Sequence, residues 1–231
     1  MESLIEFLSG FATPHRYQLF REVAAQRTRY ITLVLEDIYQ PQNASAVLRT
    51  GDCLGIQDVH IIEERNRYKL NPDVELGSAQ WLDLYRYNKP EGNINEAIQG
   101  LKANGYRIVA TTPHSKDVSL DDFDLAPGKI ALLFGTELKG LSEQALSLSD
   151  EFVRIPMSGF TESFNISVSA AIIAYNLMRD LRNSTLNWHL TKEDQNLLVL
   201  DWLRKSIKHS EQLEKRFIFD NQNKDPWQSN L

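Results

Sequence analysis

Short apolar segments alternate with helical segments through the middle of this chain, and this alternation limits the folds that it can adopt. Six segments have the character of strands: 30–37, 58–64, 81–87, 106–112, 129–135 and 151–157. Helices are expected between them, at 42–54, 93–103, 142–149 and 165–183. This order predicts an α/β fold with a mostly parallel sheet flanked by helices on both faces.

The two ends of the chain lack such strand segments. Residues 1–28 predict a short helix, a turn at Thr13-Pro14 and a second helix rich in arginine. Residues 191–217 predict one long amphipathic helix. We therefore expect three parts: a helical extension over 1–29, a core over 30–183, and a second helical extension with a polar tail over 184–231.

The bulk properties narrow the class of protein without indicating a function. A chain of 231 residues with 42% hydrophobic content can bury one sizeable α/β core. The only cysteine, Cys53, excludes an intramolecular disulfide, fits a reducing cytoplasmic setting and predicts a small buried side chain. The N-terminus lacks a basic leader and the apolar stretches fall far short of roughly 20 residues, so we expect neither a signal peptide nor a membrane span.

The formal net charge of −6 argues against a nucleic-acid partner, but phosphates are bound by local patches rather than by net charge. Segment 14–29 carries four arginines: Arg16, Arg21, Arg27 and Arg29. A second basic cluster falls in a predicted loop, with Tyr68 interleaved between Arg65, Arg67 and Lys69. Each patch permits RNA binding, but charge alone favours an ordinary solvated surface for both.

Polar residues follow the predicted strands at positions where a buried core should be apolar. In segment 40–55, Asn43 and Arg49 lie six positions apart, within two turns of a predicted helix that follows the first strand. The end of a strand is where open α/β sheets bind their ligands. We therefore expect this segment to belong to a functional site.

Two later segments have the same character. In segment 133–146, Gly135 and Gly140 bracket four residues after an apolar strand, and glycines there permit a close approach of backbone to ligand. The spacing matches neither the phosphate-binding P-loop nor the dinucleotide fingerprint. Segment 155–182 has a run of serine and asparagine that leads into a strongly apolar helix, and taken alone such a run is typical of a simple helix start.

Together the three segments form a recognisable pattern. They contain N-x-x-A-x-x-R-T over 43–50, F-G-T-E-x-x-G-L-S over 134–142, and I-P-M-x-G-x-x-x-S-x-N-x-S-V-S-A over 155–170. The pattern resembles the three motifs of the SpoU/TrmH family, in the SPOUT superfamily, in the family's order and spacing. The resemblance covers residues 30–183.

This resemblance implies a fold, a reaction and a partner. Family members transfer a methyl group from S-adenosyl-L-methionine to a ribose 2′-oxygen of RNA, without a metal. Their sheet carries a C-terminal trefoil knot that holds the cofactor, a topology that general rules of chain connection would not have predicted. By the same resemblance, we expect a cytoplasmic homodimer with each active site near the subunit interface.

The resemblance also assigns residues to roles. Five polar residues match the family's catalytic set: Asn43, Arg49, Glu137, Ser163 and Asn165. Four positions match the cofactor pocket: Thr111, Gly135, Ile155 and Phe164, where Phe164 replaces a frequent leucine. In relatives with a similar N-terminal extension, arginines there contact tRNA, which makes Arg16 and Arg21 candidates for RNA binding.

Arg49 corresponds to the family's catalytic arginine, but its chemistry limits what it can do. A ribose 2′-hydroxyl needs its proton removed or its developing charge stabilised. Arginine is protonated at any ordinary pH, since its pKa exceeds about 12. This favours Arg49 as a clamp on the adjacent phosphate and a stabiliser of the oxyanion, although proton abstraction stays an alternative.

The choice of RNA depends on the attachments to the core. Short helical extensions at both ends resemble those of family members that methylate guanosine 18 in the tRNA D-loop, which is our expectation. A ribosomal-RNA or wobble-position tRNA methyltransferase is the alternative within the family. A non-catalytic RNA-binding relative and an unrelated nucleotide-binding α/β protein are the alternatives beyond it.

Overall fold

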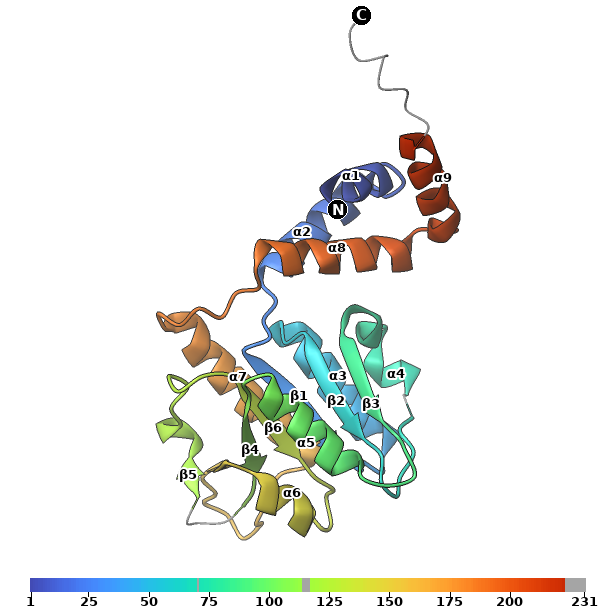
Figure 1. Cartoon of the computed structure of the whole chain (residues 1–231). Helices are drawn as coiled ribbons and strands as arrows, with labels where there is room; N and C mark the ends of the chain where they lie inside the picture. Colours follow the sequence, from blue (N-terminus) through green and yellow to red (C-terminus); the bar gives the residue numbers. More distant parts are fainter. Residues whose placement is uncertain (70, 114–116, 223–231) are drawn as a thin grey trace, which may run out of the picture. The chain divides into compact units, whose positions relative to one another are not determined.

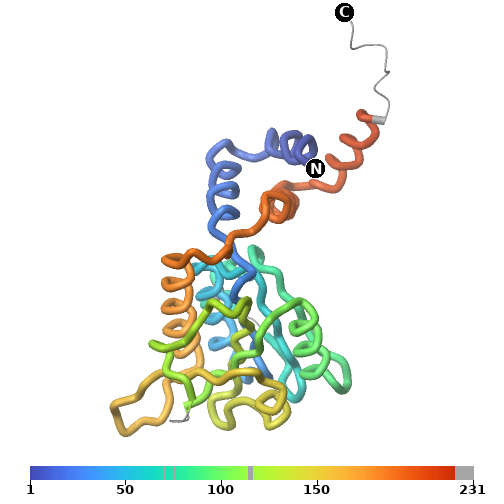
Figure 2. Tube along the Cα trace, turned by 60° about the vertical axis from the view of Figure 1, so that its left-hand side comes forward, coloured from blue at the N-terminus to red at the C-terminus, as the bar shows by residue number. Residues whose placement is uncertain are grey.

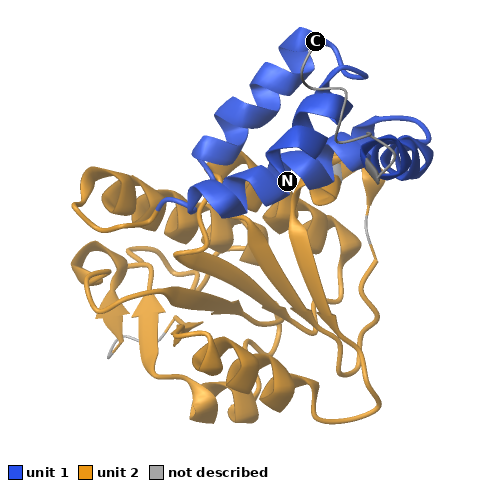
Figure 3. Cartoon of the chain, turned by 45° about the horizontal axis from the view of Figure 1, so that its top comes forward, with its two compact units in different colours: residues 1–27, 189–231 blue, residues 28–188 orange. Residues whose placement is uncertain are grey.

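The computed structural model describes residues 1–69, 71–113 and 117–222, and the chain divides into two compact units (Figure 3). The larger unit is Thr28–Trp188. The smaller unit combines both ends of the chain, Met1–Arg27 and the segment that begins at His189. The two terminal extensions, which are far apart in the sequence, therefore form one unit.

Seven strands of the described residues form a single sheet in the larger unit, in the order β3-β2-β1-β6-β4-β7-β5 (Figure 1). Every neighbouring pair is parallel, which confirms the predicted sheet. The strands are β1 (Ile31–Glu36), β2 (Asp58–Ile62), β3 (Asp83–Tyr87), β4 (Arg107–Thr111), β5 (Val118–Ser119), β6 (Ile130–Phe134) and β7 (Glu151–Arg154).

Helices cover both faces of this sheet, also as predicted. One face is covered by α3 (Pro41–Leu54) and α7 (Ile166–Asn183), and the other by α5 (Asn93–Ala103) and α6 (Glu143–Leu148). A strand sends successive side chains to opposite faces. Accordingly, Leu33 of β1 packs in the α3/α7 cluster, whereas Val34 packs in the α5/α6 cluster.

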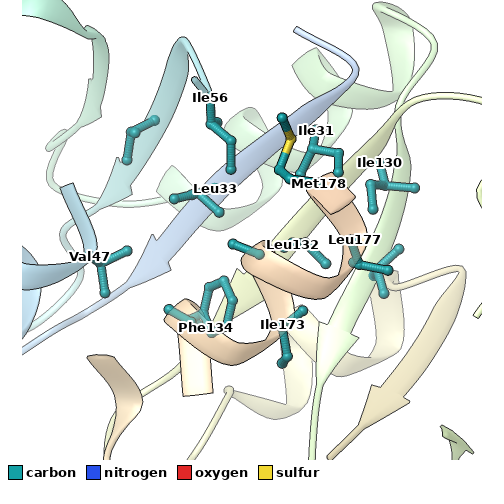
Figure 4. Close-up of a cluster of buried hydrophobic side chains, with 14 of the residues drawn as sticks. Ile31, Leu33, Val47, Ile56, Ile130, Leu132, Phe134, Ile173, Leu177 and Met178 are labelled. Carbon is teal, nitrogen blue, oxygen red and sulfur yellow. The ribbon is translucent and has the colours of Figure 1, made fainter. Parts of the chain in front are cut away.

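The core between the sheet and the α3/α7 layer is built mainly from aliphatic side chains, with Phe134 and Met178 among them (Figure 4). Leu33 of β1 and Leu132 of β6 meet Val47 of α3 and Leu177 of α7, and all four are fully buried. Burying a side chain of this size contributes roughly 1.5–3 kcal/mol. This layer fixes the two helices that carry the first and third motifs.

Four short elements were not expected from the sequence: α4 (Pro72–Glu75), η1 (Ser78–Trp81), β5 and η2 (Leu120–Asp122). Each has only two to four residues. A segment of that length is too short to display a helical or strand period, so no pattern could predict it.

The smaller unit consists of α1 (Glu2–Ser9), α2 (Pro14–Ala25), α8 (Lys192–Ser206) and α9 (Ser210–Gln222). The predicted start of the second helix is confirmed: the Thr13 hydroxyl accepts the Arg16 amide, and Pro14 occupies the first turn. Trp202 of α8 joins the two chain ends, since its ring packs edge-on against Phe20 at 5.8 Å.

The prediction of one continuous helix over 191–217 is wrong, because α8 ends at Ser206 and α9 begins at Ser210 (Figure 2). His209 takes a left-handed backbone conformation with φ of 60°, which interrupts the helical hydrogen bonds. Neither glycine nor proline marks this break in the sequence, and the apolar spacing continues through it.

Two expectations about burial are also corrected. Cys53 is exposed, because it lies on the outer side of α3, about half a turn beyond the buried Gly51. Two of the four arginines in the 14–29 patch do not contribute a free positive charge to the surface. Arg27 is 1% exposed, over the Trp202 ring, and Arg29 forms ion pairs within the larger unit.

Candidate active site

The three motifs emerge at one edge of the sheet. In a parallel sheet the carboxyl ends of all strands meet at the same edge. The first motif follows β1 in α3, the second follows β6, and the third follows β7 and leads into α7. The connections after these strands therefore converge, although their sequence positions span more than 120 residues from Asn43 to Asn165.

Glu137 of the second motif accepts hydrogen bonds from the first and third motifs through one carboxylate oxygen. The side-chain amide of Asn43 donates to Glu137 Oε1 at 2.9 Å, and that of Asn165 donates to the same oxygen at 2.5 Å. Asn165 Nδ2 also lies 3.2 Å from Asn43 Oδ1. The structure thus brings together three of the five predicted catalytic residues in one hydrogen-bonded cluster.

Asn165 also fixes the start of α7. Its Oδ1 accepts the backbone amide of Ser167 at 2.8 Å and the Ser167 hydroxyl at 2.6 Å, which makes Asn165 the N-cap residue of this helix. The cap orients the side chain so that its amide nitrogen faces Glu137. The simple helix-start role and the site role therefore coexist in one residue.

The other two predicted catalytic residues stand apart from this cluster. Arg49 is exposed on α3, and its side chain forms no hydrogen bond or ion pair with any residue that the structure describes. Ser163 is exposed and lines a cavity beside Glu137, without a hydrogen bond to the cluster. Both side chains are therefore available to an incoming molecule.

A cavity of about 370 Å³ opens beside the cluster, between the ends of β4 and β6 and the segment that leads into α7. All four residues predicted to bind the cofactor line it: Thr111, Gly135, Ile155 and Phe164. Glu137 lines it as well, so the same carboxylate borders both the cavity and the cluster. A cavity of this size is in the range of small-molecule sites.

Gly135 is required by the loop that forms one wall of this cavity. Thr136 and Gly140 exchange two backbone hydrogen bonds, at 2.9 and 2.8 Å, which close the loop tightly. A Cβ atom at Gly135 would collide with the Gly140 carbonyl group. The glycine therefore serves the closure of the loop itself, and Gly140 supplies the positive φ of 66° at its end.

These motifs correspond to one family of known proteins. The sequence profile described as the SpoU rRNA Methylase family matches residues 30–175, which is more than half of the chain. The chain belongs to this family. The match includes all three motifs in full and the first part of α7.

Several relatives share more than the SpoU core. A Borreliella burgdorferi protein named tRNA (guanosine(18)-2'-O)-methyltransferase is 45% identical over 210 residues, covering 91% of this chain and 94% of the relative. The Escherichia coli K12 protein of the same name is 30% identical, covering 81% of this chain and 82% of the relative. Both alignments extend beyond residues 30–175, so the similarity includes parts of the extensions.

Solved structures of SpoU proteins have the same fold. The Aquifex aeolicus TrmH/SpoU tRNA modifying enzyme superposes with a TM-score of 0.74 at 25% identity, covering 84% of this chain and 98% of that chain. The SpoU methyltransferase AviRb from Streptomyces viridochromogenes, in complex with AdoMet, gives a TM-score of 0.58 at 25% identity, covering 71% of this chain and 62% of that chain. The trefoil knot stays a prediction for this chain.

Sequence comparison with the SpoU motifs did not single out Glu36, yet this residue supports the second motif. Its Oε2 accepts the backbone amide of Ser142 at 2.9 Å, at the start of α6. Burial raises the pKa of the Glu36 carboxyl, and the hydrogen bonds from Ser142 oppose that rise. A buried acid at the end of an apolar strand is the signal that could have drawn attention to it.

Apolar residues of the SpoU motifs that were not assigned roles also line the cavity. They are Leu141 of the second motif and Met157 of the third, and Ile173 of α7 lines the cavity beside them. Their signal was weak, because an apolar residue inside an α/β core is expected on packing grounds alone.

The two RNA-binding candidates of this SpoU-family chain differ in their surroundings. Arg16 is exposed on α2, with no side-chain partner among the residues that the structure describes. Arg21 is half-buried, and its guanidinium binds the Tyr17 hydroxyl and Asn196 Oδ1 within the smaller unit. Arg16 is therefore the freer of the two to contact a phosphate.

Two further findings concern classes of site. Over the described ranges, no group of His, Cys, Asp and Glu side chains is arranged to hold a metal ion. Over the same ranges, no helix combines the length and the apolar character needed to cross a bilayer.

Proposed function

We propose that this chain is an S-adenosyl-L-methionine-dependent RNA 2′-O-ribose methyltransferase that acts on guanosine 18 in the D-loop of tRNA. One observation carries the proposal: Glu137 hydrogen-bonds to Asn43 and Asn165 while lining the adjacent cavity. The three motifs of the SpoU family thus contribute to one site that has room for a cofactor and an open side for a nucleotide.

The cavity suits S-adenosyl-L-methionine in its size and in the chemistry of its lining. Apolar side chains of Leu141, Ile155 and Phe164 offer walls for an adenine ring, and the loop around Gly135 offers backbone groups for polar atoms. When bound, this cofactor supplies an electrophilic methyl group for transfer to the ribose 2′-oxygen. The cavity therefore fits the cofactor that the SpoU relative AviRb binds.

Arg49 is proposed to act on the RNA side of the reaction. Because its guanidinium is exposed and unpaired among the described residues, it is free to form a bidentate contact with a phosphate next to the target ribose. Its permanent charge would also stabilise the developing oxyanion, and the phosphate could accept the proton. Asn43, Glu137, Asn165 and Ser163 would position the ribose.

The choice of tRNA rests on the relatives whose names specify guanosine 18 and whose similarity covers most of both chains. Arg16 on the N-terminal extension supports a phosphate contact outside the core, whereas Arg21 would first have to release Tyr17 and Asn196. We also propose a cytoplasmic location, which is compatible with a tRNA substrate.

A homodimer is part of the proposal. Apolar side chains are exposed on one face of α7, where Val168 is 43% and Tyr175 is 58% exposed, seven positions and two turns apart. Phe160 in the preceding segment is fully exposed as well. Clustered apolar exposure of this kind is typical of an interface. Light scattering should give twice the chain mass, and Tyr175→Asp should shift the protein toward monomer.

The activity is tested with methyl-labelled cofactor and an unmodified tRNA transcript, followed by mapping of the labelled nucleotide. A matched transcript with 2′-deoxyguanosine at position 18 lacks the acceptor oxygen and should receive no label. Transfer to ribosomal RNA alone would select the alternative substrate. RNA binding without transfer would select a non-catalytic relative.

Arg49→Ala separates binding from catalysis. We expect turnover to fall by at least about 100-fold, as on removal of a transition-state donor, while cofactor affinity changes less than about threefold. Turnover within about tenfold of wild type would contradict the role proposed for Arg49.

A further inference from the structure

The loop after β2 alternates inward and outward side chains. Asn66 and Tyr68 are partly buried, whereas Arg65, Arg67 and Lys69 between and beside them are exposed. None of the three cations forms an ion pair or a side-chain hydrogen bond with any residue in the described ranges. The loop therefore presents a row of three free positive charges on a chain whose net charge is −6.

Asp37, directly after β1, holds the first part of this loop. Its Oδ1 accepts the backbone amides of Arg65 and Asn66 at 2.8 and 2.6 Å. The Asn66 side-chain amide donates in return to the Asp37 carbonyl at 2.8 Å. Asp37 itself has a φ of 55°, an uncommon conformation that these three hydrogen bonds stabilise.

Glu63 holds the second part of the loop. This carboxylate, 2% exposed, accepts the Tyr68 amide at 2.5 Å and the Arg86 guanidinium at 2.9 Å. The same guanidinium lies over the Tyr68 ring, 5.4 Å from its centroid. The hydrogen bonds of Asn66 and Tyr68 thus fix the backbone of this loop, and in that conformation the three cations point to solvent.

The end of the loop is tied to the helix of the first motif. The Asn71 amide donates to the hydroxyl of Ser45 on α3 at 2.8 Å. Ser45 lies one turn before Arg49 on this helix, and positions four apart share a helix face. Since β1 and β2 are neighbours (Figure 1), the loop leaves the sheet at the edge where α3 begins.

We propose that Arg65, Arg67 and Lys69 form a cationic platform that binds the phosphate backbone of the RNA substrate beside Arg49. This inference rests on the proposed function, since it assigns the platform to the same RNA. Glu64, the acidic residue directly before the platform, accepts the Ile94 amide at 3.2 Å and so faces α5. Phosphate contacts of this kind position a nucleic acid and give a salt-dependent affinity.

The experiment compares two double variants that remove the same charge from the full-length protein. R65A/R67A removes two platform cations. K89A/K129A removes two exposed lysines that already have local partners, since Lys89 pairs with Glu96 and Lys129 lies over the Tyr106 ring. Affinity for an unmodified tRNA transcript is measured by fluorescence anisotropy at several salt concentrations, and cofactor affinity and methyl transfer are measured alongside.

We expect R65A/R67A to weaken tRNA binding by about tenfold or more and to reduce the salt slope by about two. Its KM for tRNA should rise while kcat at saturating tRNA and cofactor affinity stay at wild-type values. K89A/K129A should bind tRNA as the wild type does. Equal binding by both double variants and the wild type would overturn the platform, as would an equal loss in both.

The binding arm also separates this inference from the proposed function. If the wild type binds tRNA without methylating it, the proposed function is wrong. The platform is then still tested by the difference in tRNA affinity between R65A/R67A and the wild type. If the wild type methylates tRNA and R65A/R67A leaves KM unchanged, the platform fails alone. If a ribosomal-RNA fragment or a protein partner binds through these arginines and tRNA does not, the platform is rejected as a tRNA site.

Discussion

The side-chain amide of Asn43 donates to Glu137 Oε1 at 2.9 Å, although 94 positions separate the two residues in the sequence. The same oxygen accepts Asn165 at 2.5 Å. A single carboxylate therefore holds the start of α3 and the start of α7 in register with the loop after β6. Since Glu137 also lines the cavity, it couples the shape of the proposed cofactor site to the position of the proposed ribose site.

Removing the Glu137 carboxylate should impair catalysis more than folding. In Glu137→Ala, Asn43 and Asn165 lose their shared acceptor, and water can replace the carboxylate because Glu137 is exposed. We expect kcat to fall about 10–100-fold, with the melting temperature within about 2 °C because the side chain is exposed. Glu143→Ala removes an equal charge from the exposed first turn of α6 and should retain activity. An equal loss in both variants would contradict the coupling.

Adding one methyl group at Gly135 should damage the cavity wall. Because the new Cβ would collide with the Gly140 carbonyl group, the loop must open. We expect Gly135→Ala to bind S-adenosyl-L-methionine at least about tenfold more weakly by calorimetry and to lose about 1–3 kcal/mol of stability. Gly100→Ala is the matched control, since its Cβ meets nothing within 4 Å on α5 and should stabilise the helix by about 0.5–1 kcal/mol. Unchanged cofactor affinity in Gly135→Ala would show that the loop tolerates opening.

His60 should make the fold less stable in acid. Burial lowers its pKa to about 4, and its ring stacks on Tyr85 at 4.7 Å. In the unfolded chain the pKa is about 6.5. Between these values the unfolded chain binds a proton that the folded chain excludes, so stability falls as the pH drops from about 6.5 to about 4. Urea unfolding across this range should show a weaker acid dependence for His60→Phe than for the wild type, and parallel curves would contradict the prediction.

Asp58 should act in the opposite direction over much of the same range. Burial raises the pKa of its carboxyl to about 6, although the ion pair with Arg29 opposes the rise. The folded chain therefore keeps a proton that the unfolded chain releases above about 3.9. This contribution to stability is full below about pH 4 and is lost as the pH rises through about 6. Asp58→Asn should lack this loss. The unfolding free energy of the wild type minus that of the variant should therefore decrease as the pH rises. An increase in this difference would contradict the prediction.

The sequence predicted the meeting of the motifs because two independent signals agreed. The strand pattern places each motif after a parallel strand, and such strand ends share one edge of the sheet. The resemblance of the motifs to those of the SpoU family then identified Asn43, Glu137 and Asn165, which the structure joins by hydrogen bonds. The four residues predicted to bind cofactor likewise line one cavity.

Charge and burial were predicted less well, since they depend on partners that are distant in the sequence. Arg29 counted toward a surface patch, yet Asp58 and Asp83 draw it into ion pairs across 29 and 54 positions. Likewise, the apolar spacing at 191–217 gave no sign that His209 would separate α8 from α9. Such features follow from tertiary contacts, which a local period does not encode.

Because the smaller unit is formed by both ends of the chain, its helices are synthesised at different times. Helices α1 and α2 leave the ribosome first, but α8 and α9, against which Phe20 and Phe7 pack, are made only after residues 28–188. At roughly 5–20 residues per second, about 10–30 s separate the two halves of this unit. During that interval the apolar faces of α1 and α2 on the nascent chain lack α8 and α9 to pack against. A chaperone that covers short amphipathic helices would therefore improve the yield of the folded protein.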